Sequence, residues 1–133
     1  MNVINLQVKT GNKKYPIIIG KNILNKTQKF LKENFINFNQ CLVVIDKNVP
    51  KNQIEKVLNS LPKNKTFIHH FNASEKNKNQ KSINKILSIL LSKNFNRNDC
   101  LISIGGGITG DVSGFATSIF KRGIKFVNIP TTL

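Results

Sequence analysis

The sequence has no tryptophan, one methionine and only two cysteines in 133 residues. Cys41 and Cys100 are far apart and form no C-x-x-C spacing, so we expect two buried free thiols rather than a disulfide framework. No apolar run approaches the roughly 20 residues of a membrane span. The first residues also lack the basic-then-apolar pattern of a signal peptide. These absences predict a cytoplasmic protein with no membrane partner.

Acidic residues are scarce: 6 stand against 21 lysines and arginines, a formal net charge of +15. Such an excess is typical of proteins that bind phosphate-rich polymers. Only Arg97 and Arg122 are arginines, and the lysines are scattered among asparagine and isoleucine, as A/T-rich coding would also produce. The phenylalanines follow core spacings and form no platform for stacking bases. We therefore predict no nucleic-acid partner, with a polyanion-binding surface as the alternative.

The pattern of apolar residues changes several times between strand and helix periodicity. Strand-like runs are VINLQV (3–8), expected to be half-buried, YPIII (15–19), CLVVID (41–46), KTFIHHF (65–71), DCLISI (99–104) and KFVNIP (125–130). Helical faces are expected over 22–35, 54–61, 79–93 and from the glycines after residue 104 to about residue 121. The first two strands suggest a hairpin, and the rest alternate with helices.

This alternation predicts an α/β fold, a Rossmann-like doubly wound and mainly parallel sheet preceded by an N-terminal β-hairpin. Ligands of such sheets bind outside the carboxyl ends of the strands. The chain stops three residues after its last strand. We therefore expect residues 1–133 to be one cofactor-binding domain that is incomplete at its C-terminal end.

Glycines gather where the fifth of these strands meets a helix. Gly105, Gly107 and Gly110 satisfy G-x-G-x-x-G, and bare backbone N–H groups at a helix start suit a phosphate or pyrophosphate. Tight turns also collect glycines, which leaves a purely structural role open. The acidic residue usual about 20 positions downstream is absent, since Asp111 is the last acid. Asp46, at the end of an earlier strand, is the expected replacement beside the glycines.

No residue cluster suggests metal binding or nucleophilic catalysis. His69 and His70 are adjacent on a strand and point to opposite faces, so they cannot readily share an ion. The serines lack the G-x-S-x-G context of a nucleophile elbow. We predict no catalytic residue and no metal ligand within this chain.

The segment GGGITGDVSGFATSIFKRGIKFVNIPTTL (105–133) closely resembles the glycine-rich core of the dehydroquinate synthases. Looser similarity covers the rest, including VVIDKNV and SEKNK. The resemblance implies an enzyme of the shikimate pathway, a phosphate-eliminating lyase. It would convert 3-deoxy-D-arabino-heptulosonate 7-phosphate to 3-dehydroquinate with NAD as a transient hydride acceptor and a divalent metal, zinc or cobalt.

The resemblance also implies roles for individual residues. Asp46 and Asn48 would meet the adenosine end of NAD, and Glu75 and Lys78 its ribose. The glycine segment would hold the pyrophosphate and the nicotinamide ribose, and two threonines would close over the cofactor; these residues are Gly106, Gly107, Ile108, Thr109, Gly110, Asp111, Thr131 and Thr132. Arg122 would reach the substrate phosphate of the neighbouring subunit in a homodimer.

Two departures from the family pattern limit this reading. Where the family pattern has D-G-E, this sequence has Ala73-Ser74-Glu75. Family members are also more than twice as long as this chain. Their metal ligands and a helical C-terminal domain lie beyond Leu133, so we expect this chain to be inactive alone. The alternatives are a sibling sugar-phosphate cyclase, such as 2-deoxy-scyllo-inosose synthase, and a basic nucleotide- or nucleic-acid-binding module without chemistry.

Overall fold

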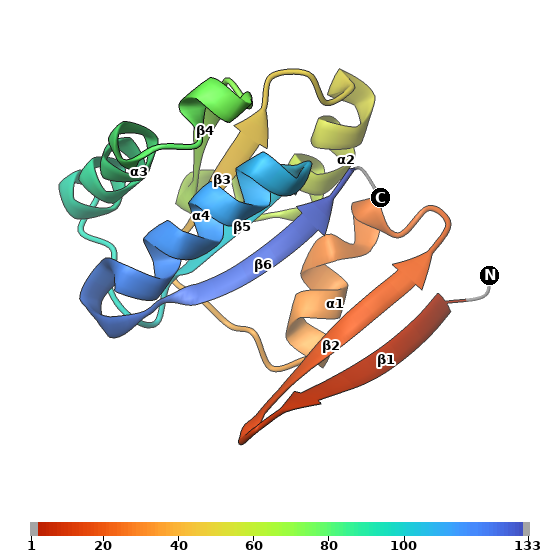
Figure 1. The fold of residues 1–133 in the computed structure, drawn as a ribbon. Helices are drawn as coiled ribbons and strands as arrows, with labels where there is room; N and C mark the ends of the chain where they lie inside the picture. Colours follow the sequence, from red (N-terminus) through yellow and green to blue (C-terminus); the bar gives the residue numbers. More distant parts are fainter. Residues whose placement is uncertain (1–2, 132–133) are drawn as a thin grey trace.

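The computed structural model describes residues 3–131, which form a hairpin and a layered α/β unit (Figure 1). The strands are β1 (Val3–Thr10), β2 (Lys13–Gly20), β3 (Cys41–Asp46), β4 (Thr66–Phe71), β5 (Cys100–Gly105) and β6 (Lys125–Pro130). The helices are α1 (Thr27–Glu33), α2 (Lys51–Ser60), α3 (Gln80–Ser92) and α4 (Gly107–Ile119). Short 3-10 turns include η3 (Glu75–Asn77) and η4 (Phe120–Arg122).

The strands form two separate sheets. β1 and β2 pair antiparallel, and the other four strands are parallel in the order β4-β3-β5-β6. Both the hairpin and the parallel sheet predicted from the sequence are confirmed. All four parallel strands therefore end at the same side of the sheet. We call this side the carboxyl edge; its residues are Asp46, Phe71, Gly105 and Pro130. The strands begin at the opposite side, the amino edge, with Cys41, Thr66, Cys100 and Lys125.

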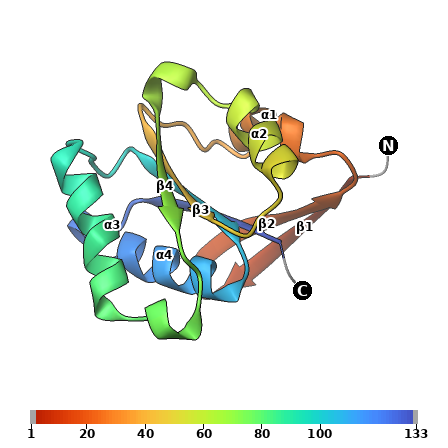
Figure 2. The same ribbon diagram turned by 90° about the horizontal axis from the view of Figure 1, so that it is seen from above.

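Helices cover both faces of the parallel sheet: α1 and α2 lie on one, α3 and α4 on the other (Figure 2). Leu42 and Leu101 face α3 and α4, whereas Val43 and Ile102 face α1 and α2. The central strands β3 and β5 are consequently buried on both sides, which explains their almost wholly apolar sequences.

Both cysteines are buried free thiols, as predicted. Cys41 and Cys100 are partners across β3 and β5. Burial raises the pKa of each thiol, so both are protonated and unreactive at neutral pH.

Three details differ from the sequence prediction. VINLQV is not half-buried, because Ile4 and Leu6 are 53% and 48% exposed on a hairpin face that nothing in residues 3–131 covers. The first helix ends at Glu33, and Phe35 adopts a φ of 60° and is 88% exposed. The last helix ends at Ile119, because η4 follows with positive φ angles at Lys121 and Arg122.

Helix α4 begins inside the glycine segment, at Gly107. Residues 107–111 are therefore the first turn and a half of a helix, as the sequence prediction of a helix that starts among these glycines implied. None of the helices within residues 3–131 has the length and apolarity needed to cross a membrane.

Candidate nucleotide-binding site

The candidate site lies at the carboxyl edge, where the strand order reverses. Chain connections lead from β3 outward to β4 on one side, and on the other side β5 is followed by β6. α2 follows β3 on one face of the sheet and α4 follows β5 on the other, which opens a crevice between the strand ends. Asp46 and Gly105 meet there: a Cβ added to Gly105 would lie 2.9 Å from the Asp46 Cβ. The sequence prediction that the sheet brings Asp46 beside the glycines is confirmed.

The N-terminus of α4 is open for an anion. Its N-cap is Gly106, no side chain within the described chain caps it, and its first turn holds no acidic residue. The first N–H groups of a helix have no partner inside the helix, and the helix dipole adds a partial positive charge. Gly110 N–H bonds back to the Gly106 carbonyl, so the free N–H groups precede it.

The glycines of the segment serve different purposes. A Cβ on Gly105 would lie 2.7 Å from the Thr109 Oγ1, so this position is bare to let α4 pack closely on β5. A Cβ on Gly110 would lie 3.1 Å from the Asn128 Oδ1, which makes this glycine a packing position also. Only at Gly107 among these three would a Cβ meet nothing within 4 Å. Gly107 is therefore the one of these three glycines at which contacts within residues 3–131 leave room for a side chain.

Thr109 lies underneath the helix start. Its side chain is fully buried, and its Oγ1 has no hydrogen-bond partner among residues 3–131. Because the hydroxyl faces Gly105 and the sheet, Thr109 can offer a ligand only its backbone N–H.

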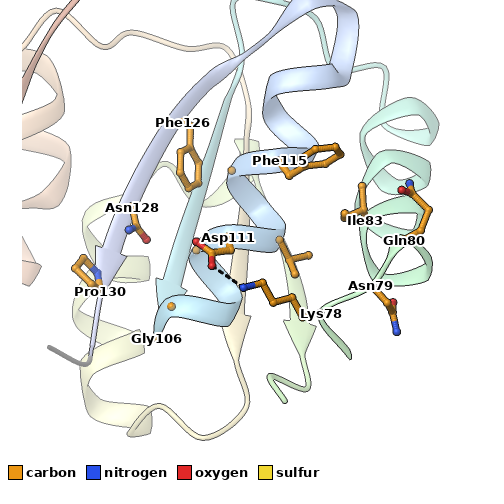
Figure 3. A pocket seen from close by; sticks show the side chains of 14 residues that line it. Lys78, Asn79, Gln80, Ile83, Gly106, Asp111, Phe115, Phe126, Asn128 and Pro130 are labelled. Atoms are coloured by element: carbon orange, nitrogen blue, oxygen red, sulfur yellow. Dashed lines mark ion pairs between the residues drawn. The ribbon is translucent and has the colours of Figure 1, made fainter. Parts of the chain in front are cut away.

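A pocket of about 870 Å³ opens along the outer side of α4 (Figure 3). Its floor is α4 from Gly107 to Phe115, one wall is the start of α3 with Lys78 and Ile83, and the other wall is β6. The pocket thus begins at the open helix start and continues past it by two helical turns.

An ion pair crosses this pocket. The Lys78 Nζ lies 3.1 Å from the Asp111 Oδ2, and the two side chains are 47% and 63% exposed (Figure 3). Lys78 follows η3 and precedes the N-cap of α3, Asn79, whose side chain accepts the Ser82 N–H. The pair therefore ties the loop before α3 to the second turn of α4, and it places one cation and one carboxylate next to the helix start.

The remaining predicted residues lie around the same edge. The Asp46 Oδ1 accepts the Asn48 N–H at 3.0 Å, which leaves the Oδ2 of Asp46 for a ligand hydroxyl and leaves the Asn48 side chain exposed. Glu75 is exposed in η3. The Thr131 N–H donates to the Gly105 carbonyl at 2.9 Å, so the end of β6 is fastened to the glycine segment. Thr132 lies outside the described residues.

Arg122 is not part of this constellation. It follows α4 in η4, and Lys125 then starts β6 at the amino edge. The 13 residues of α4 separate it from Gly107 by about 20 Å at 1.5 Å per residue. Arg122 therefore cannot contact a ligand held at the α4 start of its own chain.

The described residues offer no metal site: no group of three or more histidines, cysteines, aspartates or glutamates gathers in residues 3–131. His69 faces the α3 side of the sheet and His70 is exposed on the other face. Burial lowers the pKa of His69, with smaller contributions from Lys85 and His70.

Sequence reasoning missed Asn128 in the pocket wall and the buried Ser103 that holds its side chain. Ser103, fully buried on β5, donates its hydroxyl to the Asn128 Oδ1 at 2.7 Å, and Asn128 lines the pocket from β6. The only signal in the sequence is that each polar residue interrupts an otherwise apolar strand.

An open helix start at the switch point of a doubly wound sheet, with a carboxylate on the neighbouring strand end, is an arrangement typical of α/β domains that bind nucleotides. The chain is similar to the 3-dehydroquinate synthases. Residues 68–133 match the family described as 3-dehydroquinate synthase N-terminal. The whole chain is 71% identical to a 3-dehydroquinate synthase of Pelagibacter ubique and 38% identical to one of Prochlorococcus marinus, of which it covers 36% and 38%.

Solved structures share the fold. A 2-deoxy-scyllo-inosose synthase with carbaglucose-6-phosphate, NAD+ and Co2+ superposes with a TM-score of 0.85 over 96% of this chain and 35% of its own, at 22% identity. A 2-epi-5-epi-valiolone synthase from Streptomyces hygroscopicus with NAD+ and Zn2+ gives 0.72 over 94% of this chain and 34% of its own, also at 22% identity. The chain thus spans about a third of the length of these proteins.

Proposed function

We propose that this chain is the NAD-binding part of a 3-dehydroquinate synthase. The parent reaction would convert 3-deoxy-D-arabino-heptulosonate 7-phosphate to 3-dehydroquinate and phosphate. The observation that carries the proposal is the uncapped α4 start, where Gly107 faces open space and the preceding Gly105 lies beside Asp46. The 71% identity to a relative of that name supports the choice of reaction over that of a sibling cyclase.

The residues at the carboxyl edge fit NAD. The N–H groups at the start of α4 would bind the pyrophosphate, and Asp46 would accept hydrogen bonds from ribose hydroxyls. Lys78 and Asp111, which are paired at 3.1 Å, would lie together beside the cofactor, where the lysine can neutralise phosphate charge and the carboxylate can accept from a second ribose. When bound, NAD would supply a reversible acceptor for the hydride of a substrate hydroxyl.

The described residues do not fit the divalent metal, because they contain no cluster that could hold it. No step of the reaction is therefore assigned to a metal in this chain. In a homodimer, Arg122 could bind a ligand of the other subunit. Its planar guanidinium can bind two phosphate oxygens at once, and Arg122 lies near the amino edge of the sheet, away from the pocket of its own chain. We infer that Arg122 serves the substrate phosphate of a second copy.

NAD binding by the wild-type chain and a Gly107→Val variant tests the proposal, measured by calorimetry at low and at high salt. The added side chain would point into the open space at the helix start, so we expect binding to be lost while the unfolding midpoint stays within a few degrees. Gly110→Val is less informative, because its side chain would meet Asn128 and disturb packing.

The salt dependence separates the two classes of function. Specific NAD binding should weaken by less than about tenfold between 50 and 500 mM salt. A polyanion surface would lose affinity by orders of magnitude over this range and would be indifferent to Gly107→Val. That second pattern, or the absence of NAD binding, would refute the proposal.

A further inference from the structure

We propose that the amino edge of the parallel sheet carries a second binding site, in which Arg97 and Lys125 hold the phosphate group of a small phosphorylated compound. A cavity of about 550 Å³ opens at this edge; its lining residues are Arg97, Asn98, Gly123, Ile124 and Lys125. It lies at the opposite end of the strands from the α4 start, so the inference goes beyond the nucleotide site of the proposed function. Arg122 is not among the lining residues of this cavity.

The pairing of β5 with β6 brings the two cations together. Arg97 precedes β5, and Lys125 is the first residue of β6. Lys125 is the partner of Cys100 across the two strands, and its N–H donates to the Asp99 carbonyl at 3.3 Å. The connections from α3 to β5 and from α4 to β6 therefore meet at one corner of the sheet (Figure 1). Residues that are far apart in the sequence thus line one cavity.

The backbone that carries Arg97 is fixed by a tight turn. The Asp99 N–H donates to the Asn96 carbonyl at 3.0 Å, and the Asn98 N–H donates to the Asn96 Oδ1 at 2.9 Å. The fully buried Asp99 carboxylate accepts the Asn96 N–H at 2.8 Å. Arg97 lies between these anchored residues with its side chain exposed. A turn that is already ordered loses less entropy when it binds a ligand.

The Lys125 ammonium is held at the other side of the cavity. It donates to the carbonyl of Asn37 and to that of Asn98, the latter at 3.4 Å. An ammonium has three N–H donors, so one is left for a ligand.

The charge of Lys125 has no counter-ion at this edge. Its carbonyl partners are neutral, and the ion pairs within residues 3–131, Lys29–Glu33 and Lys78–Asp111, lie elsewhere. The Lys125 side chain is also half-buried, and a cation that is partly removed from water favours a bound anion.

The chemistry of the two side chains selects phosphate. The planar Arg97 guanidinium can bind two oxygens of one phosphate, and the Lys125 ammonium can bind a third. Their two positive charges match the dianion that a phosphate monoester forms near neutral pH. A cavity of about 550 Å³ is in the range of small-molecule sites and leaves room for the organic part of such a compound.

Titration of the chain with glycerol 3-phosphate in 100 mM salt, followed by amide NMR shifts, tests the inference. We expect the largest shifts at Asn98 and Gly123 and a dissociation constant of about 1 mM. Arg97→Gln should weaken binding by about tenfold, and Arg97→Lys, which keeps the charge, should weaken it less. Lys65→Gln removes an exposed charge from the same edge but outside the cavity, so it should change binding by less than about twofold.

Four results would overturn the inference. Equal weakening by Arg97→Gln and Lys65→Gln would indicate a diffuse positive surface, and equal affinity for succinate would show that the site does not select phosphate. The absence of shifts, or shifts confined to the α4 start, would show that no site exists at the amino edge. Gly107→Val should leave the shifts at Gly123 unchanged, and Arg97→Gln should bind NAD as the wild type does. Failure of this inference is therefore distinguishable from failure of the proposed function.

Discussion

The two edges of the parallel sheet differ in whether their polar groups have hydrogen-bond partners within the chain. At the amino edge, polar groups are satisfied by the chain itself. The buried Asp99 carboxylate accepts N–H groups from Gln40 and Asn96 at 3.1 and 2.8 Å, and the Lys121 ammonium donates to the Phe95 carbonyl at 3.0 Å. Lys125 likewise donates to backbone carbonyls of Asn37 and Asn98.

The carboxyl edge is left incomplete. The α4 start has no side-chain cap in residues 3–131, and the Thr109 hydroxyl beneath it has no partner there. Its ion pair is on the surface, where water screens it. The amino edge thus stabilises the fold, and the carboxyl edge is the one that the proposed function assigns to binding. Substitutions of buried groups at the amino edge should change stability alone, and those at the carboxyl edge should change mainly binding.

The largest expected effect is at Asp99. Asp99→Ala would remove a fully buried carboxylate and leave the part-buried Gln40 and Asn96 N–H groups without their acceptors, and we expect the free energy of unfolding to fall by about 3 kcal/mol. Urea unfolding measures this, and NAD affinity of the folded fraction should not change. Asp99→Asn, which keeps one acceptor oxygen, should lose less. A loss below about 1 kcal/mol for Asp99→Ala would show that this edge is not held by the carboxylate.

Two glycines of one motif should respond differently. Gly105→Ala brings a methyl group within 2.7 Å of the Thr109 Oγ1 and 2.9 Å of the Asp46 Cβ, so it should lower the free energy of unfolding by about 2 kcal/mol. Gly107→Ala meets nothing and lies at the first helical position, so it should be neutral or stabilising by up to about 1 kcal/mol. Thermal unfolding of the pair checks this; equal destabilisation by both would remove the distinction between packing and ligand glycines.

The sequence predicted the elements that depend on local pattern. β3 and β5 are buried on both faces and have the expected continuous apolar runs, and parallel pairing alone places Asp46 beside Gly105. The carboxyl edge was predictable because a strand followed by glycines and a helix has few alternative geometries.

Features that depend on distant partners were not predictable. Gly110 faces Asn128, 18 positions away, and no periodicity reveals that contact. The apolar pattern of β1 predicts burial, but burial requires a covering element, and none in residues 3–131 covers Ile4 and Leu6. Phe35 has the spacing of a helical face, yet the helix ends at Glu33, two residues before it.

The Lys78–Asp111 ion pair should contribute little to stability. Both side chains are about half exposed, so a double-mutant cycle with Lys78→Ala and Asp111→Ala should give a coupling free energy of about 0.5 kcal/mol or less. The coupling should vanish in 0.5 M salt. The exposed Lys29–Glu33 pair on α1 is the matched control. A coupling above about 2 kcal/mol would place a stabilising element at the carboxyl edge and break the comparison of the two edges.

His69 belongs to neither edge and gives the smallest effect, a pH dependence of the sheet itself. Burial lowers its pKa below the ordinary value of about 6.5, so the unfolded chain binds a proton more readily than the folded chain. The free energy of unfolding should therefore fall as pH drops below about 6.5 and level off below the folded pKa. Urea unfolding at pH 7.5 and pH 5 should show a smaller difference for His69→Gln than for the wild type. His70→Gln, on the exposed opposite face, should keep most of that difference, and an equal change in both variants would mean that burial of His69 is not the cause.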